Sequence, residues 1–558
     1  MTFVKKQIIQ DLLKTLPQNQ AELLDWKRKI SKKYKIKLLK NSELIEMRKR
    51  FYPVKKVFHG VNPDKSTKLN SKALELFDRI KKRAVRTSSG VSIITVLTKP
   101  FKCPGNCVYC PSEPKMPKSY LSNEPAAQRA LKLKFNPIKQ VQMRIQALEN
   151  NGHKVDKIEL LILGGSFTAY TKKYQEKFVR DCFYAVNNYN KKNRATKSLE
   201  EEQKINEKSK YKIIGLTLET RPDEINLKTI KFFRKLGCTR VQLGIQHTDN
   251  KILKLIKRGH TVEDSIFATR LLKENGFKVD HHFMPDLPGS TPAKDFKMMK
   301  KVFTNPDFCP DQIKIYPCVV NEFAEIFKWF KNPRKALQRG EKKYKPYSKK
   351  QLFDLLLKIK KITPYWIRIN RLIRDIPKDS IIAGNKITNL RQYLTNELEK
   401  SGEKCKCIRC REVGLQKMNY ESGIMNYEKK ELFIEKYQAS EGTEYFLSFE
   451  SANRKILYGF LRLRFNNSNA QLAFSVLKNS ALIRELHIYG QMTPVSAKLN
   501  SSVQHKGLGK KLMLEAEKIA RQNGLKKIAV ISGIGVREYY RKLNYKLKDT
   551  YMIKNIKI

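Results

Sequence analysis

The sequence has few acidic residues and no long apolar run. Its 558 residues include 53 Asp and Glu against 114 Lys and Arg, a formal net charge of +61. No stretch approaches the roughly 20 apolar residues of a membrane-spanning helix. The first residues lack the apolar core and small-residue cleavage site of a secretion signal. We therefore expect a cytoplasmic protein without membrane contact.

The excess of positive charge predicts a polyanionic partner. The positive charges of such a chain repel one another unless a negatively charged partner neutralises them, and nucleic acid is the obvious candidate. A general lysine bias on solvated faces is the alternative explanation, and it contributes in either case.

Cysteine is scarce as well, with ten residues in the whole chain. That number is too small for a disulfide scaffold. Because the chain shows no export signal, closely spaced thiols predict metal binding instead. Four cysteines are scattered and are predicted to be small buried hydrophobic residues. The other six form two clusters: Cys103, Cys107 and Cys110, and Cys405, Cys407 and Cys410.

The pattern of charge and hydrophobicity divides the chain into four parts. Residues 1–85 are basic and helix-like, and they form either solvated amphipathic helices or an RNA-docking surface. Residues 86–400 alternate strands with helices. Residues 401–415 form a cysteine-rich linker, and residues 416–558 have the strands and the strong helix of a single α+β domain. The predicted fold class is therefore α/β, a partial (βα)6 barrel fused to an α+β domain.

Polar or glycine-rich segments follow the predicted barrel strands. Six strands are expected, and in βα barrels the carboxyl ends of the strands carry the active site. The segment at 188–210 is polar and without periodicity, so we expect an irregular inserted loop there. The predicted strands are residues 91–97, 157–163, 211–219, 239–245, 277–283 and 312–316.

The spacing Cys103-x3-Cys107-x2-Cys110 places three thiolates on one short loop after the first strand. Three ligands leave one iron of a [4Fe–4S] cluster open, and the open iron can chelate S-adenosylmethionine (SAM). A structural zinc site needs four ligands, and no fourth is near. This spacing is the signature of radical-SAM enzymes.

Gly164, Gly165 and Ser166 follow the second strand and are expected to approach SAM. Glu219, Arg221 and Gln246 are further candidates for SAM, and ordinary structural roles for these three are left open.

A glycine loop marks the C-terminal domain. Gln504-x-x-Gly507-x-Gly509 precedes a strong helix, as in the pyrophosphate loop of GNAT acetyltransferases, where backbone N–H groups bind coenzyme A. The preceding strand contains Glu485 to Ile488 and is expected to pair with pantetheine, and Tyr539 and Tyr540 are expected to reach the thioester.

The cluster Cys405-x-Cys407-x2-Cys410 provides most of a zinc site with a structural role. A fourth ligand is not evident, so unmetallated linker cysteines are the alternative.

A radical-SAM barrel fused to a GNAT domain resembles the catalytic subunit of Elongator. The resemblance covers roughly residues 40–558 and includes the segments GHKVDK (152–157), GGSF (164–167), ETRPD (219–223), KIYP (314–317) and RELHIYG (484–490). It implies transfer of a carboxymethyl group to C5 of the anticodon wobble uridine of tRNA, with acetyl-CoA as the carbon source.

The resemblance also implies roles for individual residues. Lys314 and Tyr316 would line the radical site and act with Tyr540 as catalytic residues. The implied partners are the tRNA anticodon stem-loop and acetyl-CoA, with other Elongator-type subunits or a homodimer as further candidates. The implied contacts to acetyl-CoA are Lys157, Glu485, Leu486, His487, Ile488, Leu508, Gly509, Lys510 and Tyr540, beside the loop residues Gln504 and Gly507 and the neighbouring Tyr539.

Two other functions remain to be weighed. A protein lysine acetyltransferase with a structural iron–sulfur cluster would transfer acetyl groups without SAM. A non-catalytic tRNA-binding scaffold would keep the basic surface but would have no need of the first cysteine cluster or of the glycine loop.

Overall fold

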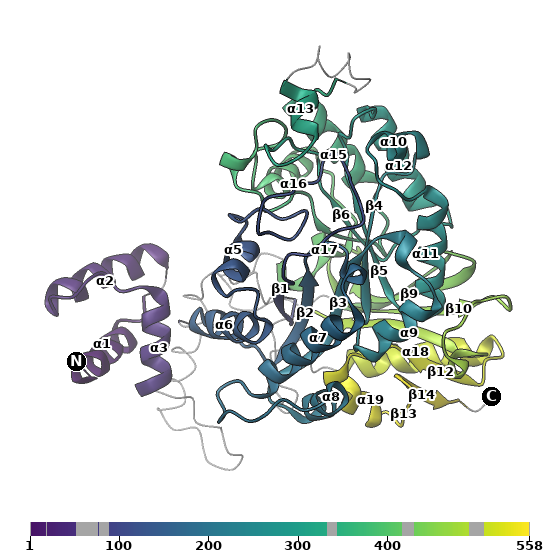
Figure 1. Ribbon diagram of the computed structural model, residues 1–558. Helices are drawn as coiled ribbons and strands as arrows, with labels where there is room; N and C mark the ends of the chain where they lie inside the picture. The colour runs from purple at the N-terminus through teal and green to yellow at the C-terminus, as the bar shows by residue number, and fades with distance from the viewer. Residues whose placement is uncertain are drawn as a thin grey trace.

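The computed structural model describes residues 2–17, 19–51, 76, 89–331, 343–415, 429–489 and 507–556. Three regions are visible in Figure 1: purple helices to one side, a barrel in the centre, and a yellow C-terminal sheet below it. None of the helices in the described ranges is a candidate membrane span.

The N-terminal region is helical, as predicted, over α1 (Thr2–Thr15), α2 (Gln20–Lys33) and α3 (Asn41–Phe51). These helices have their own apolar core, in which Leu12, Trp26 and Leu44 are buried. In Figure 1 they stand apart from the rest, and α3 lies next to α6 (Pro137–Asn150). Residues 52–75 and 77–85 of the predicted basic region lie outside the described residues.

The barrel is a seven-stranded parallel sheet in chain order, one strand more than the six predicted. The seventh strand was missed because its sequence, RINR, contains a single apolar residue. Among the described residues, the first and last strands each pair with one neighbouring strand, so this part of the chain forms a barrel that is open on one side. The strands are β1 (Ser92–Leu97), β2 (Lys157–Leu163), β3 (Lys212–Thr220), β4 (Arg240–Gln246), β5 (Lys278–Phe283), β6 (Gln312–Ile315) and β7 (Arg368–Arg371).

Helices cover the outside of the barrel, where apolar strand residues such as Ile162 and Leu218 are fully buried. The irregular loop expected at 188–210 was wrong in part, because this segment contains α8 (Leu199–Lys208). Ser198 and Glu201 form a capping box at its start, a signal present in the sequence. The other helices are α5 (Pro125–Lys132), α7 (Lys172–Asn187), α9 (Leu227–Lys235), α10 (Asn250–Leu255), α11 (Val262–Glu274), α12 (Pro292–Thr304), α13 (Ile326–Lys331), α15 (Lys349–Ile362), α16 (Leu390–Lys400) and α17 (Ile408–Arg411).

The C-terminal region forms a second seven-stranded sheet in the order β13-β14-β12-β11-β10-β9-β8. Its strands are mostly antiparallel, but β11 and β12 run parallel. The elements are β8 (Lys430–Gln438), β9 (Gly442–Ser451), β10 (Leu457–Asn466), β11 (Ala481–Ile488), α18 (Leu508–Gln522), β12 (Lys527–Val530), α19 (Arg537–Arg541), β13 (Lys546–Lys548) and β14 (Tyr551–Asn555).

The two sheets pack tightly at the amino-terminal ends of the barrel strands. The loop after β12 touches the foot of β3, where a Cβ added to Gly533 would lie 1.9 Å from the carbonyl oxygen of Ile214. Asp311, just before β6, accepts a hydrogen bond of 2.8 Å from Arg484 of β11. The second sheet therefore closes the amino-terminal end of the barrel, opposite the predicted active-site face.

Candidate active site and cysteine sites

A cavity of about 740 Å³ extends from the first cysteine loop to strand β11 of the second sheet. It is lined at one end by Cys103, Cys107 and Cys110, which follow β1. At the other end it is lined by Glu485 and His487 of β11, in the second sheet. Its size falls within the ordinary range for small-molecule sites, roughly 300–1,000 Å³.

The first cysteine loop has the electrostatics of a metal-binding loop. Nη1 of the buried Arg258 donates a hydrogen bond to Sγ of Cys107 across 3.4 Å. Burial alone would raise the pKa of Cys107, but the charge and hydrogen bond of Arg258 outweigh it, and the pKa lies below its usual value. Burial raises the pKa of Cys110 to about 12. Three thiols that face one cavity, with a buried cation beside them, fit a [4Fe–4S] cluster with one open iron.

The glycine pair after β2 binds Glu219. The backbone N–H groups of Gly164 and Gly165 donate to Oε1 of Glu219 at 2.8 and 2.7 Å, and the hydroxyl of Tyr120 donates to the same oxygen at 2.8 Å. Gly164 has φ +143°, and a Cβ there would lie 1.9 Å from Oγ1 of Thr98. Only glycine fits, and the amides orient the Glu219 carboxylate at the cavity wall.

The other predicted SAM residues differ in their surroundings. Arg221 is engaged in a bidentate pair with Asp223, at 2.9 and 2.8 Å, so it supports the loops around the cavity. Gln246 lines the cavity from a left-handed backbone conformation, φ 74°. Ser166 is buried and also lines the cavity.

Lys314 and Tyr316 lie on β6 and at its end, and both line the cavity. Nζ of Lys314 donates to Oε1 of Gln242 at 2.7 Å. Burial lowers the pKa of Lys314 to about 8, against the opposing charge of Asp280. Burial raises the pKa of Tyr316. A buried amine that titrates near neutral pH can donate or accept a proton in the cavity.

Most of the polar residues inside the barrel were not predicted from the sequence. The available signal was alternation: in the β4 sequence RVQLGIQ, polar residues alternate with apolar ones, as expected for a strand with one polar and one apolar face. The missed residues of the barrel strands that line the cavity include Glu159, Arg240, Gln242, His282, Gln312, Arg368, Asn370 and Arg371.

The predicted coenzyme A region is formed where β11 and β12 separate. The two strands pair only from Ala481 to Ile483 of β11, and the rest of β11 diverges from β12. The helix α18 begins beside this gap, and Gly507, φ 74°, stands before its first residue. A Cβ on Gly509 would lie 3.7 Å from Cγ1 of Ile488 and 2.8 Å from the hydroxyl of Tyr539. Ile488, Gly509 and Tyr539 therefore meet at a helix N-terminus, where anions are favoured.

The remaining predicted coenzyme A residues lie around this gap or next to the barrel. Leu508 is buried, Lys510 is exposed in the first turn of α18, and Tyr540 is buried in an apolar cluster. Leu486 packs against that cluster, on the opposite face of β11 from Glu485 and His487. Lys157 lies at the foot of β2, where burial lowers its pKa. Gln504 lies outside the described residues.

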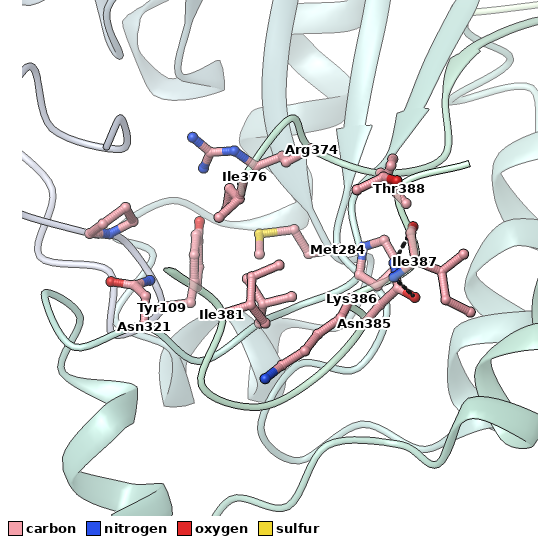
Figure 2. Close-up of a pocket in the computed structure, with 14 residues that line it drawn as sticks. Tyr109, Met284, Asn321, Arg374, Ile376, Ile381, Asn385, Lys386, Ile387 and Thr388 are labelled. Atoms are coloured by element: carbon pink, nitrogen blue, oxygen red, sulfur yellow. Dashed lines mark hydrogen bonds between the residues drawn. The ribbon is translucent and has the colours of Figure 1, made fainter. Parts of the chain in front are cut away.

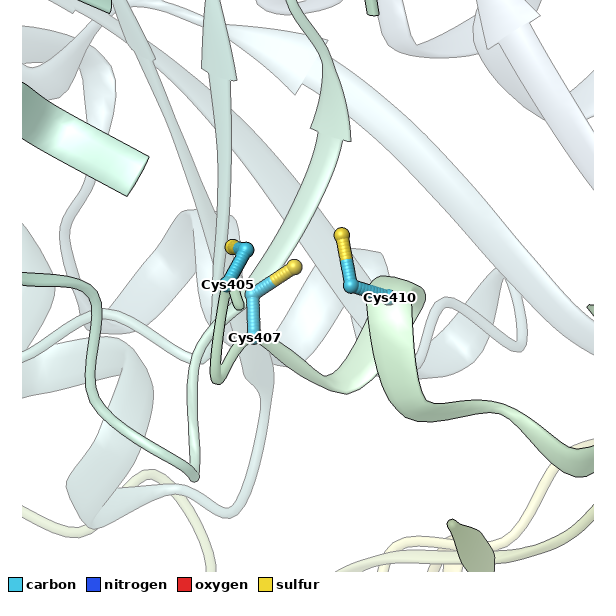
Figure 3. A group of neighbouring side chains, drawn as sticks. All are labelled: Cys405, Cys407 and Cys410. Carbon is cyan, nitrogen blue, oxygen red and sulfur yellow. The ribbon is translucent and has the colours of Figure 1, made fainter. Parts of the chain in front are cut away.

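The second cysteine cluster brings three sulfur atoms together, as Figure 3 shows. The Sγ atoms of Cys405, Cys407 and Cys410 all lie within 4.8 Å of one another. Lys360 donates from Nζ to Sγ of Cys410 at 3.5 Å. Burial alone would raise the pKa of Cys407, but hydrogen bonds from the other two cysteines and the charge of Lys360 hold it well below its usual range.

A smaller pocket of about 40 Å³ lies beside the first cysteine loop, and Figure 2 shows its lining. Tyr109, between Cys107 and Cys110, borders it together with Met284 and Arg374. Arg374 and Met284 also line the large cavity, so this pocket is a side chamber of the same region.

Three family models match consecutive parts of the chain. The Radical SAM superfamily matches residues 97–301, the Radical_SAM C-terminal domain matches residues 310–400, and the Acetyltransferase (GNAT) family matches residues 425–545.

The chain is also similar to full-length relatives. It is 46% identical over 486 residues to the tRNA uridine(34) acetyltransferase of Methanocaldococcus infernus, with 86% of this chain and 88% of that protein covered. It is 37% identical over 494 residues to Elongator complex protein 3 of Homo sapiens, with 86% and 87% covered. A solved structure of Methanocaldococcus infernus Elp3 with an N-terminal deletion superposes with a TM-score of 0.70 at 42% identity, covering 84% of this chain and 99% of that one.

Proposed function

Since the chain belongs to the family of the tRNA uridine(34) acetyltransferases and Elongator complex protein 3, we propose that it adds a carboxymethyl group to C5 of the wobble uridine of tRNA. The observation that carries this proposal is the cavity shared by the first cysteine loop and β11. A reaction that joins SAM chemistry to acetyl-CoA needs both within one enclosed space.

The iron–sulfur site would supply the starting chemistry. Cys103, Cys107 and Cys110 would hold a [4Fe–4S] cluster, which would supply the one-electron reduction of SAM and so the radical chemistry needed to activate the acetyl methyl group. Arg258 balances the negative charge of the thiolates. The Glu219 carboxylate, held by the two glycine amides, accepts hydrogen bonds from the amine or hydroxyl groups of SAM.

The polar interior of the barrel would orient the other reactants. Lys314, with a pKa of about 8, holds or releases a proton beside the acetyl carbonyl or the uracil. Tyr316, with its raised pKa, remains a neutral hydrogen-bond donor at physiological pH. Tyr540, Gly509 and the first turn of α18 would hold the thioester arm and the phosphates of coenzyme A.

The tRNA would be bound electrostatically and its target base taken out of the stack. The helix α2 and the segment that joins it to α3 carry exposed lysines, including Lys29 in the helix and Lys37 in the joining segment. Contacts of this kind to phosphates weaken steeply as the salt concentration rises. A base in a single-stranded anticodon loop can be unstacked at low cost.

We also propose a zinc ion at Cys405, Cys407 and Cys410, with a structural role. Tetrahedral zinc at about 2.3 Å from each sulfur places the sulfurs roughly 3.8 Å apart, compatible with the observed group. Among the described residues no fourth His, Cys, Asp or Glu joins the group. The zinc content of the Cys407→Ser variant, read by metal analysis, tests this site.

Reconstitution tests the proposed function. The chain is purified without oxygen, loaded with iron and sulfide, and incubated with SAM, reductant, acetyl-CoA and unmodified tRNA. Carboxymethyluridine in the digested tRNA, absent with Cys107→Ser, is the expected result, and its appearance with the single chain shows that other Elongator-type subunits are not required. Acetylation of lysine peptides with no new nucleoside would instead identify a protein lysine acetyltransferase.

A further inference from the structure

Cations at the amino-terminal ends of the middle barrel strands are paired with carboxylates. Arg240, at the start of β4, lies 2.6 Å from Glu159. Nζ of Lys278, at the start of β5, lies 3.5 Å from Oε1 of Glu485. Pairs of this kind neutralise the buried cations and leave little charge to attract a ligand.

Two arginines at the same end of the barrel share one carboxylate. Glu412, just after α17, accepts a hydrogen bond from Nη1 of Arg368 at one oxygen and from Nη1 of Arg409, at 3.0 Å, at the other. Both arginines line the large cavity. Arg391 adds a further positive charge near Arg409, opposed by the thiol of Cys407 when it is ionised. This part of the cavity wall therefore carries an excess of positive charge.

The same side chains have hydrogen-bond donors to spare. A guanidinium has five N–H donors, and among the described residues Arg409 donates to Glu412 alone, although its side chain is only 24% exposed. Nη2 of Arg368 also has no hydrogen-bond partner in the described part of the chain. The hydroxyl of the buried Tyr489 accepts from Arg368 at 2.9 Å, and its own proton is free for another acceptor. Since Tyr489 lines the cavity as well, these donors are available to an oxyanion inside it.

The position of the three side chains limits which anion they can meet. The carboxylate of SAM is expected at the first cysteine loop, at the opposite ends of the barrel strands. The phosphates of coenzyme A are expected at the start of α18, and no described residue of α18 lines the cavity. Two oxyanions remain: a carboxylate formed from the acetyl group, and a phosphate of the tRNA backbone.

Thioester hydrolysis creates a charge inside the cavity. Water adds to the carbonyl carbon, the C–S bond breaks, coenzyme A leaves as the thiol, and the neutral acyl group becomes a carboxylate with release of a proton. A carboxylate out of contact with bulk water is costly unless a cation pairs with it. The planar fork of an arginine can bind both of its oxygens at once.

We propose that Arg409, Arg368 and Tyr489 form a binding site for the carboxylate of the carboxymethyl group on the wobble uridine. This inference rests on the proposed function. The site distinguishes the product from the substrate, because unmodified uracil has no charged group to place there.

Three synthetic anticodon stem-loops that differ only at the wobble base test the site. They carry uridine, 5-carboxymethyluridine and the methyl ester of 5-carboxymethyluridine, which keeps the substituent but removes its charge. Fluorescence anisotropy gives their affinities for the iron-loaded chain at one fixed salt concentration. We expect the acid to bind at least ten-fold more tightly than the ester.

Substitutions of Arg409 should remove this preference. In Arg409→Gln the acid and the ester should bind within two-fold of each other. Arg409→Lys should keep part of the preference, because it retains the charge but not the fork. Arg521→Gln, at an exposed position in the last turn of α18, is the matched control and should leave the preference unchanged.

Other results would overturn the site. Equal affinity of the parent chain for the acid and the ester would do so without any variant. An equal loss of affinity for all three stem-loops in Arg409→Gln would identify a contact to a backbone phosphate instead. If the expected preference appears but the reconstituted chain forms no carboxymethyluridine, the carboxylate site stands and the proposed function is wrong. If carboxymethyluridine forms without the preference, the function stands and the site is wrong.

Discussion

Arg258 donates a hydrogen bond to the sulfur of Cys107, although the two residues are 151 positions apart in the chain. Arg258 follows α10, and it also donates through Nε to the carbonyl oxygen of Gly244 on β4 at 3.1 Å. It thus links the cysteine loop to the wall of the barrel. A cation at this point stabilises a negatively charged cluster, most strongly when the cluster is reduced.

Replacing Arg258 should therefore lower the reduction potential of the loaded cluster. A hydrogen bond to a charged group contributes about 1.5 kcal/mol or more, which for one electron corresponds to roughly 60 mV. We expect Arg258→Gln to shift the potential by about that amount to more negative values, as measured by a redox titration followed by electron paramagnetic resonance. Arg258→Lys should recover part of the shift, and Arg28→Gln, on an exposed helix, none. An unchanged potential in Arg258→Gln would show that this contact does not tune the cluster.

The buried Lys314 should make stability depend on pH. Its pKa is about 8 in the folded protein and 10.5 when unperturbed. Between these values the unfolded chain keeps a proton that the folded protein has lost, so the free energy of unfolding rises with pH in this window. In the Lys314→Met variant, the unfolding free energy does not show this increase with pH. The stability of the variant relative to the parent should fall by roughly 3 kcal/mol from pH 8 to 10.5.

Urea denaturation of both proteins across this pH range measures the effect. Lys400→Met, at an exposed position, provides the control and should run parallel to the parent protein. A constant difference between Lys314→Met and the parent would mean that Lys314 remains protonated throughout this range.

The contact between the barrel and the second sheet depends on Asp311. Burial alone would raise its pKa, but the charges of Arg484 and Arg462 hold the pKa well below its usual range. Asp311→Asn removes one of the two carboxylates paired with each of these buried cations, leaving Glu444 beside Arg484 and Glu485 beside Arg462. The substitution should cost about 3 kcal/mol of unfolding free energy at pH 7, the lower end of the cost of breaking a buried ion pair. Asp311 stabilises the folded protein at pH values above its pKa in the unfolded chain, which is near 4, and this stabilisation is lost as the pH falls further. The difference in unfolding free energy between the variant and the parent protein should therefore become smaller in acid. Asp25→Asn, which removes an exposed ion pair with Arg28, should change the unfolding free energy by less than about 1 kcal/mol. A similar loss of unfolding free energy in Asp311→Asn and Asp25→Asn would contradict this account.

Gly164 should be essential for SAM binding. Alanine at φ +143° is strained by about 1–3 kcal/mol and would also collide with Thr98. The resulting shift would remove the amide hydrogen bonds that orient Glu219. We expect Gly164→Ala to bind SAM at least ten-fold more weakly in the iron-loaded protein, measured by equilibrium dialysis. Gly402→Ala also has a positive φ, +72°, but meets nothing within 4 Å, and it should bind SAM normally. Normal binding by Gly164→Ala would exclude this role for the glycine pair.

The sequence predicts the parts of this molecule that depend on local patterns. The six barrel strands were found because each is a short apolar run followed by glycine or polar residues, and the structure places each within two residues of its prediction. The cysteine loop and the helix α18 were predicted from the sequence spacing of the cysteines and of the glycines, which does not depend on the rest of the fold. The strand β7 was missed because it is held by pairing with β6 rather than by its own apolar residues.

The sequence could not predict how distant residues combine inside the barrel. Glu159 and Arg240 are 81 positions apart in the chain, and the curvature of the sheet brings their side chains to 2.6 Å from each other. Glu219 was expected to contact SAM, but its bond to the glycine amides depends on the relative placement of β2 and β3. The shared cavity depends in the same way on how the second sheet docks below the barrel.

The most direct test of the shared cavity follows the hydrogen atom that leaves acetyl-CoA. The iron-loaded chain is incubated with SAM, reductant, tRNA and acetyl-CoA deuterated on its methyl group, and the 5′-deoxyadenosine is analysed by mass spectrometry. The account predicts one deuterium in the 5′-deoxyadenosine, because the C–D bond of the acetyl methyl breaks as the new bond to the 5′ carbon forms. 5′-Deoxyadenosine without deuterium, formed together with modified tRNA, would show that SAM and acetyl-CoA do not react with each other and would contradict the account.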